Sequence, residues 1–253
     1  MAKAEGGKMV CVTGAGGFIG SWVVKELLLR GYAVRGTARD PSSQKNSHLQ
    51  KLEGAKERLC LNYADVMDYD SLSVAFNGCE GVFHVASPVS VDPQTWAYDA
   101  WCSHQPSVLY TWTQIGAMIQ SWMRAAGLVV VLPAMTLGQM LQSTINPSIR
   151  HIADFLNGSR KTHRNAVAGY VDARDVARAH ALVYEDPKAH GRYLCIASVL
   201  HRCEDSKQMV QPFKFSNQRL RDLGLTFTPI KESLYNTLIC LREKGHLPPY
   251  SSL

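Results

Sequence analysis

The fold of this chain is decided by the stretch Val10-Cys11-Val12-Thr13-Gly14-Ala15-Gly16-Gly17-Phe18-Ile19-Gly20. It begins as a short apolar strand, passes through a glycine-rich turn and enters a helix, which we expect to continue to Arg30 and end near Gly31. A second apolar run, at residues 33–38, follows directly. Strand, glycine turn, helix and strand in this order form the βαβ unit in which a dinucleotide fingerprint is meaningful.

The three glycines of this turn have separate physical roles. Gly14 permits a tight turn, Gly17 lets the backbone approach a pyrophosphate, and Gly20 lets the helix pack close to the strand. The helix N-terminus adds free N–H donors and the positive end of the helix dipole. We therefore favour a nucleotide-binding turn over a purely structural one.

Composition bounds the class of protein. The chain has 253 residues, is 46% hydrophobic and carries a net charge of +6, which suits an anionic cofactor or substrate. Its basic residues are scattered, and the densest group, at 160–164, is typical of a solvated loop, so we expect no nucleic-acid partner. No apolar run reaches the length of a membrane span, and the nine histidines show no metal-ligand spacing.

The seven cysteines form no C-x-x-C pair, and residues 1–8 do not resemble a signal peptide. An odd number of unpaired cysteines is typical of a reducing compartment. We therefore expect a cytoplasmic protein.

The alternation of elements predicts an α/β protein with a doubly wound, parallel Rossmann-type sheet. In the first half we expect strands at 10–13, 33–38, 59–63, 81–86 and 128–132, with helices at 47–58, 65–77 and 110–126. Residues 91–108 show no regular period. Sheets of this type usually hold about six strands, so one strand is predicted to be missing. Either its position is vacant or strand 128–132 pairs directly with strand 81–86.

The second half predicts a smaller lobe for the substrate. It contains expected helices at 148–156, 172–184 and 232–244, a short helix that follows from 216–220 and ends at Gly224, and expected strands at 167–171 and 191–197. We place a cofactor-binding domain at 8–137 and a reduced substrate lobe, partly interleaved with it, at 138–253.

At this level of detail the chain resembles the extended short-chain dehydrogenase/reductases, and among them the plant cinnamoyl-CoA reductases and their dihydroflavonol reductase relatives. The glycine turn carries the first part of the resemblance. Further matching motifs are Arg39-Asp40-Pro41, Lys45-Asn46-Ser47-His48-Leu49, Gly81-Val82-Phe83-His84, Ala86-Ser87-Pro88-Val89, Gly169-Tyr170-Val171-Asp172-Ala173-Arg174-Asp175-Val176-Ala177 and Glu243-Lys244-Gly245-His246-Leu247-Pro248.

The resemblance implies contacts with NADP. The pyrophosphate would lie against Gly14, Gly17, Phe18, Ile19 and Gly20. The 2′-phosphate would meet Arg39 and Lys45, although Asp40 could instead bond a ribose hydroxyl and favour NAD. The remaining implied contacts are Asp65 and Val66 at the adenine, Val85, Ala86 and Ser87 at the ribose beside the nicotinamide, and Pro133 and Thr136 at the nicotinamide end.

The resemblance also implies an activity: hydride transfer from NADPH to an aromatic acyl-CoA in phenylpropanoid and lignin metabolism. The family uses a serine, a tyrosine and a lysine four residues after the tyrosine. Here the best match to the tyrosine is Tyr110, but Gln114 occupies the lysine position and the serine strand has no counterpart. A free tyrosine titrates near 10, so it is a poor proton donor at neutral pH without a neighbouring cation.

Three functional hypotheses therefore remain. The chain is an NADP-dependent reductase, a catalytically impaired paralogue that still binds NADP, or an aberrant splice product with internal deletions that folds poorly. Tyr110 is the candidate proton donor under the first hypothesis and an aromatic packing residue under the second.

Overall fold

The computed structural model describes residues 8–66, 68–86, 129–159, 167–201 and 213–248. The predicted helix at 110–126, the irregular stretch at 91–108, and the candidate residues Ser87 and Tyr110 lie outside these ranges.

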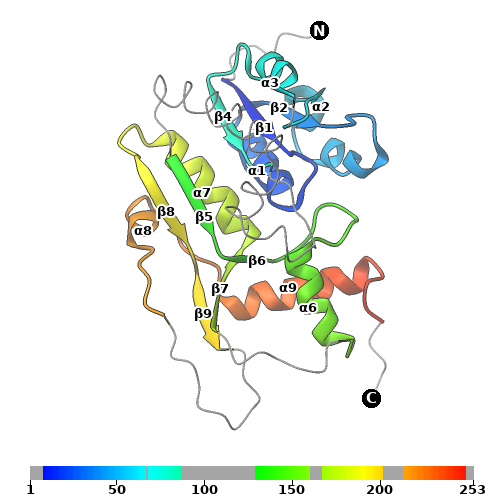
Figure 1. Cartoon of the computed structure of the whole chain (residues 1–253), viewed down its shortest axis with the longest axis vertical. Coiled ribbons are helices and arrows are strands. Elements are labelled where there is room, and N and C mark those ends of the chain that lie inside the picture. Colours follow the sequence, from blue (N-terminus) through cyan, green and yellow to red (C-terminus); the bar gives the residue numbers. More distant parts are fainter. Residues whose placement is uncertain (1–7, 67, 87–128, 160–166, 202–212, 249–253) are drawn as a thin grey trace, which may run out of the picture.

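A parallel four-stranded sheet carries the glycine turn (Figure 1). Its strand order is β3-β2-β1-β4, and every neighbouring pair is parallel. The bounds are β1 Met9–Thr13, β2 Ala33–Ala38, β3 Leu59–Tyr63 and β4 Gly81–His84. The sequence prediction for these strands is confirmed, except that β4 ends at His84, two residues before the predicted end.

Helices cover both faces of this sheet. Along β1 the side chains alternate, so that Val10 and Val12 join the cluster around helix α1 (Phe18–Leu29). Cys11 points to the opposite face and packs with α3 (Tyr69–Phe76). Burial on both faces explains why β1 reads as a continuous apolar run, and it confirms the doubly wound class.

Two further sheets follow in the chain. One pairs β5 (Val129–Pro133) with β8 (Gly191–Cys195) in parallel. The other has the order β6-β7-β9, with bounds Met135–Leu137, Val167–Asp172 and Ser198–His201. Strands β6 and β9 were not predicted, because each is short and lacks a clear alternating pattern. In the described residues β5 pairs with β8 and not with β4, so the expected alternative of direct β4–β5 pairing is not found there.

The later helices agree with the sequence prediction in type and place. They are α6 Pro147–Leu156, α7 Ala173–Glu185, α8 Gln218–Asp222 and α9 Ile230–Glu243. In the first half, the helix predicted at 47–58 is wrong. The chain forms short 3-10 turns at Gln44–Asn46 and Leu49–Lys51, and only α2 (Ala55–Arg58) is helical. Gly54, with a φ of 75°, interrupts the helix.

The predicted helix at 65–77 is also too long. It begins as α3 after Asp68, whose carboxylate accepts hydrogen bonds from the backbone N–H groups of Asp70 and Ser71. Such an N-cap fixes the start of a helix.

Helix α7 joins the two halves of the molecule, since it lies against α1 on one side and β5 on the other (Figure 1). One core cluster contains Val12 of β1 together with Leu137 of β6 and Leu241 of α9. None of the helices in the described ranges combines the length and apolarity that a bilayer crossing needs.

Candidate cofactor site

The carboxyl ends of parallel strands lie at one edge of a sheet, so the segments that follow β1, β2, β3 and β4 meet there. These segments begin with Gly14, Arg39, Ala64 and Val85. The chain leaves β1 for β2 and then β3 on one side, and it returns from β3 to β4 on the other side of β1, so the strand order reverses next to β1. This switch point is where open α/β sheets bind their ligands.

The glycine turn is formed by close backbone approaches that a side chain would block. Gly14 has a φ of +65°, and a Cβ atom there would lie 3.0 Å from the Cα of Ala86. A Cβ on Gly20 would lie only 2.1 Å from the carbonyl oxygen of Gly14. Gly14 therefore lets the β1 and β4 ends come together, which was not predicted, and Gly20 lets α1 pack onto the turn, as predicted.

The N-terminus of α1 is suited to an anion. Gly17 is the N-cap residue, no side chain caps the helix there, and its first turn contains no acidic residue. The first N–H groups of a helix have no partner within it. The N–H of Gly17 donates to the carbonyl of Gly14 at 2.9 Å. Phe18 and Ile19 thus present backbone donors where a pyrophosphate would bind.

Thr13 fixes the segment that follows β4. Its hydroxyl oxygen accepts hydrogen bonds of 3.1 Å from the backbone N–H groups of both Val85 and Ala86. It lies 3.0 Å from Nδ1 of His84, to which its proton is directed. His84 then acts as the acceptor in its neutral form, and burial lowers the pKa of His84 accordingly. Thr13 was not predicted as a site residue, because its partners lie about 70 residues away.

The segment after β2 presents two cations. Arg39 and Lys45 are both exposed, and neither side chain forms a hydrogen bond or ion pair with another described residue. The competing carboxylate of Asp40 is engaged locally: its Oδ1 accepts hydrogen bonds from the N–H of Ser42 at 3.0 Å and from the hydroxyl of Ser42 at 2.6 Å.

The other candidate contacts lie at different depths. Asp65 and Val66 follow β3, and Val66 packs on the core cluster around α3. Pro133 is exposed at the end of β5. Thr136 is buried in β6, and its hydroxyl donates to the carbonyl of Ala134 at 3.1 Å. The Thr136 hydroxyl is therefore engaged with the backbone two residues earlier.

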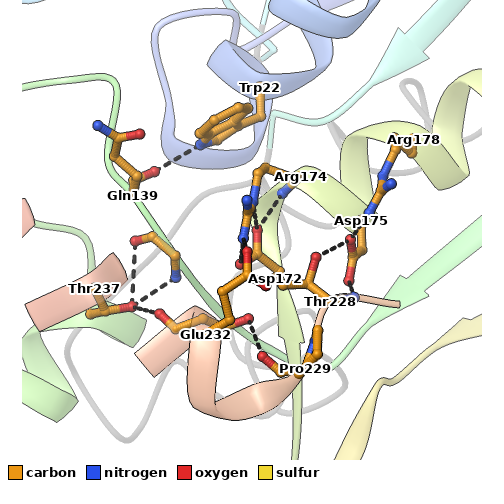
Figure 2. Close-up of polar contacts among 12 residues, drawn as sticks. Trp22, Gln139, Asp172, Arg174, Asp175, Arg178, Thr228, Pro229, Glu232 and Thr237 are labelled. Carbon is orange, nitrogen blue, oxygen red and sulfur yellow. Dashed lines mark hydrogen bonds and ion pairs between the residues drawn. The ribbon is translucent and has the colours of Figure 1, made fainter. Parts of the chain in front are cut away.

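The residues of the Asp172–Asp175 motif connect the start of α7 to α9 and to the segment before it (Figure 2). Asp172 caps α7 and accepts two hydrogen bonds from the Arg174 guanidinium, which also bonds Glu232. Asp175, on the first turn of α7, is fully buried. Its carboxylate accepts from the N–H of Thr228 at 2.7 Å and pairs with Arg178.

A hollow of about 500 Å³ lies beside this junction. Its lining comes from α1, from the start of α7 and from residues 226–229, and it includes Trp22, Arg174 and Phe227. None of the candidate cofactor residues lines it.

Comparison with known proteins gives a consistent result. Residues 10–132 match the NAD dependent epimerase/dehydratase family. Cinnamoyl-CoA reductase 1 of Oryza sativa subsp. japonica is 48% identical over 312 aligned positions, which cover 95% of this chain and 92% of that protein. Cinnamoyl-CoA reductase 1 of Petunia hybrida is 43% identical, with coverages of 97% and 96%.

The alignments also locate the difference in length. The 312 aligned positions outnumber the 253 residues of the chain, so segments of the Oryza protein have no counterpart here. Because more than nine-tenths of each chain is covered, these gaps are internal.

Among solved structures, vestitone reductase from alfalfa (Medicago sativa L.) superposes with a TM-score of 0.73 at 24% identity. The match covers 94% of this chain and 99% of that one. This similarity shows the shared fold.

Proposed function

The chain belongs to the cinnamoyl-CoA reductase family, and on this premise we propose that it binds NADP(H) and reduces an aromatic acyl-CoA thioester. The observation that carries the proposal is the edge of the four-stranded sheet, where the glycine turn and the uncapped N-terminus of α1 could receive an anion and two exposed cations follow β2. The cytoplasm remains the expected location.

The chain's own residues fit the cofactor. Gly14 and Gly20 leave a turn without side chains, and the α1 N-terminus provides donors for a pyrophosphate. Arg39 and Lys45 supply the charge that a 2′-phosphate requires, while one oxygen of the Asp40 carboxylate is bonded to Ser42. These features support NADP over NAD.

NADPH, when bound, would supply the hydride that the thioester carbonyl carbon accepts. The aldehyde then forms when the C–S bond breaks and CoA leaves as its thiol. In this proposal Thr13 holds the backbone of Val85 and Ala86 beside the ribose, and Ser87 follows in the same segment. Pro133 and Thr136 are assigned to the nicotinamide end. Tyr110 is assigned the proton that the carbonyl oxygen must receive.

A second candidate function is NADP binding without turnover, and Gln114 favours it. Glutamine is uncharged, so it cannot depress the pKa of Tyr110 as a lysine would. Loss of general acid catalysis costs about 10²–10⁴-fold in rate.

One experiment tests the first proposal: NADPH oxidation by the purified chain with feruloyl-CoA, with the Tyr110→Phe variant as control. Aldehyde formation that is lost in the variant supports the reductase. NADPH binding with no aldehyde at any enzyme concentration would establish the second candidate instead.

A further inference from the structure

We propose that Asn46 is the positioning residue that fixes Arg39 and Lys45 relative to the glycine turn, and that it thereby sets the preference for a 2′-phosphorylated cofactor. This inference rests on the proposed function, since it concerns the same cofactor.

Asn46 closes the turn that carries the two cations. It is the last residue of the Gln44–Asn46 3-10 turn, and only 8% of its surface is exposed. Its side-chain amide donates to the carbonyl of Asp40 at 2.8 Å. Its own N–H donates to the carbonyl of Ser43 at 2.9 Å. The residue after Arg39 and the residue after Lys45 are thus bonded to each other.

The same side chain rests on the glycine turn. A Cβ atom at Gly16 would lie 2.1 Å from Oδ1 of Asn46. No residue other than glycine therefore fits at position 16 while Asn46 keeps its place. One amide group consequently joins the turn that holds the cations to the turn assigned to the pyrophosphate.

A second connection runs parallel to the first. The imidazole of His48 lies 2.9 Å from the carbonyl of Lys45 and, through its other nitrogen, 2.9 Å from the hydroxyl of Ser21 in α1. Ser21 in turn donates to the carbonyl of Gly17. The segment with Lys45 is therefore bonded to the α1 N-terminus as well. Because this second connection persists when Asn46 is truncated, we expect the truncation to displace the cations without unfolding the turn.

The geometry separates positioning from charge. Asn46 carries no charge and its polar groups are directed to Asp40 and Gly16, whereas the cations bear the attraction to a phosphate. A 2′-phosphate would sense the positions of Arg39 and Lys45, and a cofactor without that phosphate would not. The effect of Asn46 should therefore depend on the 2′-phosphate and on the two cations together.

The test measures dissociation constants of NADPH and NADH for the full chain, for Asn46→Ala, for Arg39→Ala/Lys45→Ala and for the triple variant. We expect Asn46→Ala to weaken NADPH binding about tenfold, as for coupled residues in one network, and to change NADH binding less than about twofold. In the background without the cations, Asn46→Ala should cause no further loss. Gln50→Ala, which truncates an exposed amide in the next 3-10 turn, should leave both constants unchanged.

Equal losses for NADPH and NADH would overturn the inference, because they would mean that Asn46 supports the glycine turn alone. A tenfold weaker affinity for NADPH in the triple variant than in the Arg39→Ala/Lys45→Ala double variant would overturn it too. If the unmodified chain binds NADH as tightly as NADPH, the proposed cofactor preference itself fails. If it prefers NADPH and Asn46→Ala keeps that preference, only the present inference fails.

Discussion

Substitution of Gly20 by alanine should separate the folding role of the glycine turn from its binding role. The added Cβ would lie 2.1 Å from the oxygen and 2.9 Å from the carbon of the Gly14 carbonyl, and 3.2 Å from the Cα of Ala15. All three atoms belong to the backbone, and Gly14 is already held at a φ of +65°. No side-chain rotation can relieve these contacts, so α1 itself must move.

The magnitude follows from two opposing effects. Overpacking of this kind costs about 1–3 kcal/mol. Alanine returns about 1 kcal/mol of helix propensity because Gly20 lies within α1. Taking the upper part of the first range, we expect a net loss of about 2 kcal/mol, which corresponds to a fall of about 4–8 °C in the unfolding midpoint for a chain of this size.

The assay is thermal unfolding of the nucleotide-free chain, with Gly17→Ala as the matched control. Gly17 has a φ of −77°, and a Cβ there meets only the oxygen of Gly14, at 3.2 Å. Gly17→Ala should therefore shift the midpoint by less than about 2 °C while weakening nucleotide binding. A Gly20→Ala variant that unfolds at the temperature of the unmodified chain would refute the close approach of α1 to the turn.

Three further predictions follow from the buried polar groups. Asp175→Ala leaves the N–H and hydroxyl of Thr228 without their acceptor and removes the carboxylate partner of Arg178, so the free energy of unfolding should fall by about 2–4 kcal/mol, as urea titration can measure; an unchanged urea midpoint would contradict this. Burial lowers the pKa values of His48, His84 and His180 below 6.5, so the unfolded chain binds more protons than the native chain. The free energy of unfolding should therefore decrease as pH falls below about 6.5. His180→Gln should make that decrease shallower, and an identical pH profile for this variant would count against the assignment. Thr13→Val removes the acceptor for Val85 and Ala86, and it should cost about 1–3 kcal/mol of stability together with nucleotide affinity; calorimetry that finds both unchanged would exclude the proposed anchoring.

The sequence predicts the nucleotide-binding half well because its signals are local. The turn Gly14–Gly20 and the apolar runs of β1 to β4 each depend on neighbouring residues. The helix predicted at 47–58 failed because Leu49 and Leu52 suggest a periodic face, while Gly54 adopts a left-handed conformation that ends any helix before it. Strands β6 and β9 gain their place from pairing with β7, which no local pattern reveals.

The supporting residues of the site depended on distant partners. Thr13 bonds residues more than 70 positions away, and Asn46 meets Gly16 across the turn after β2. Their neighbours in sequence suggest only a strand end and a polar turn. The burial of Asp175 could likewise not be predicted from its neighbours in sequence, since the group whose hydrogen bond it accepts belongs to Thr228, 53 residues later.

The central claim is that the chain folds around a site for NADP(H), and thermal unfolding with and without NADPH, with NADH as the comparison, tests it most directly. We predict one cooperative transition that NADPH at about 100 times its dissociation constant raises by about 5–10 °C. NADH at the same concentration should raise it much less. A chain without a cooperative transition, or one that neither nucleotide stabilises, would contradict the account and leave a defective, poorly folding product as its explanation.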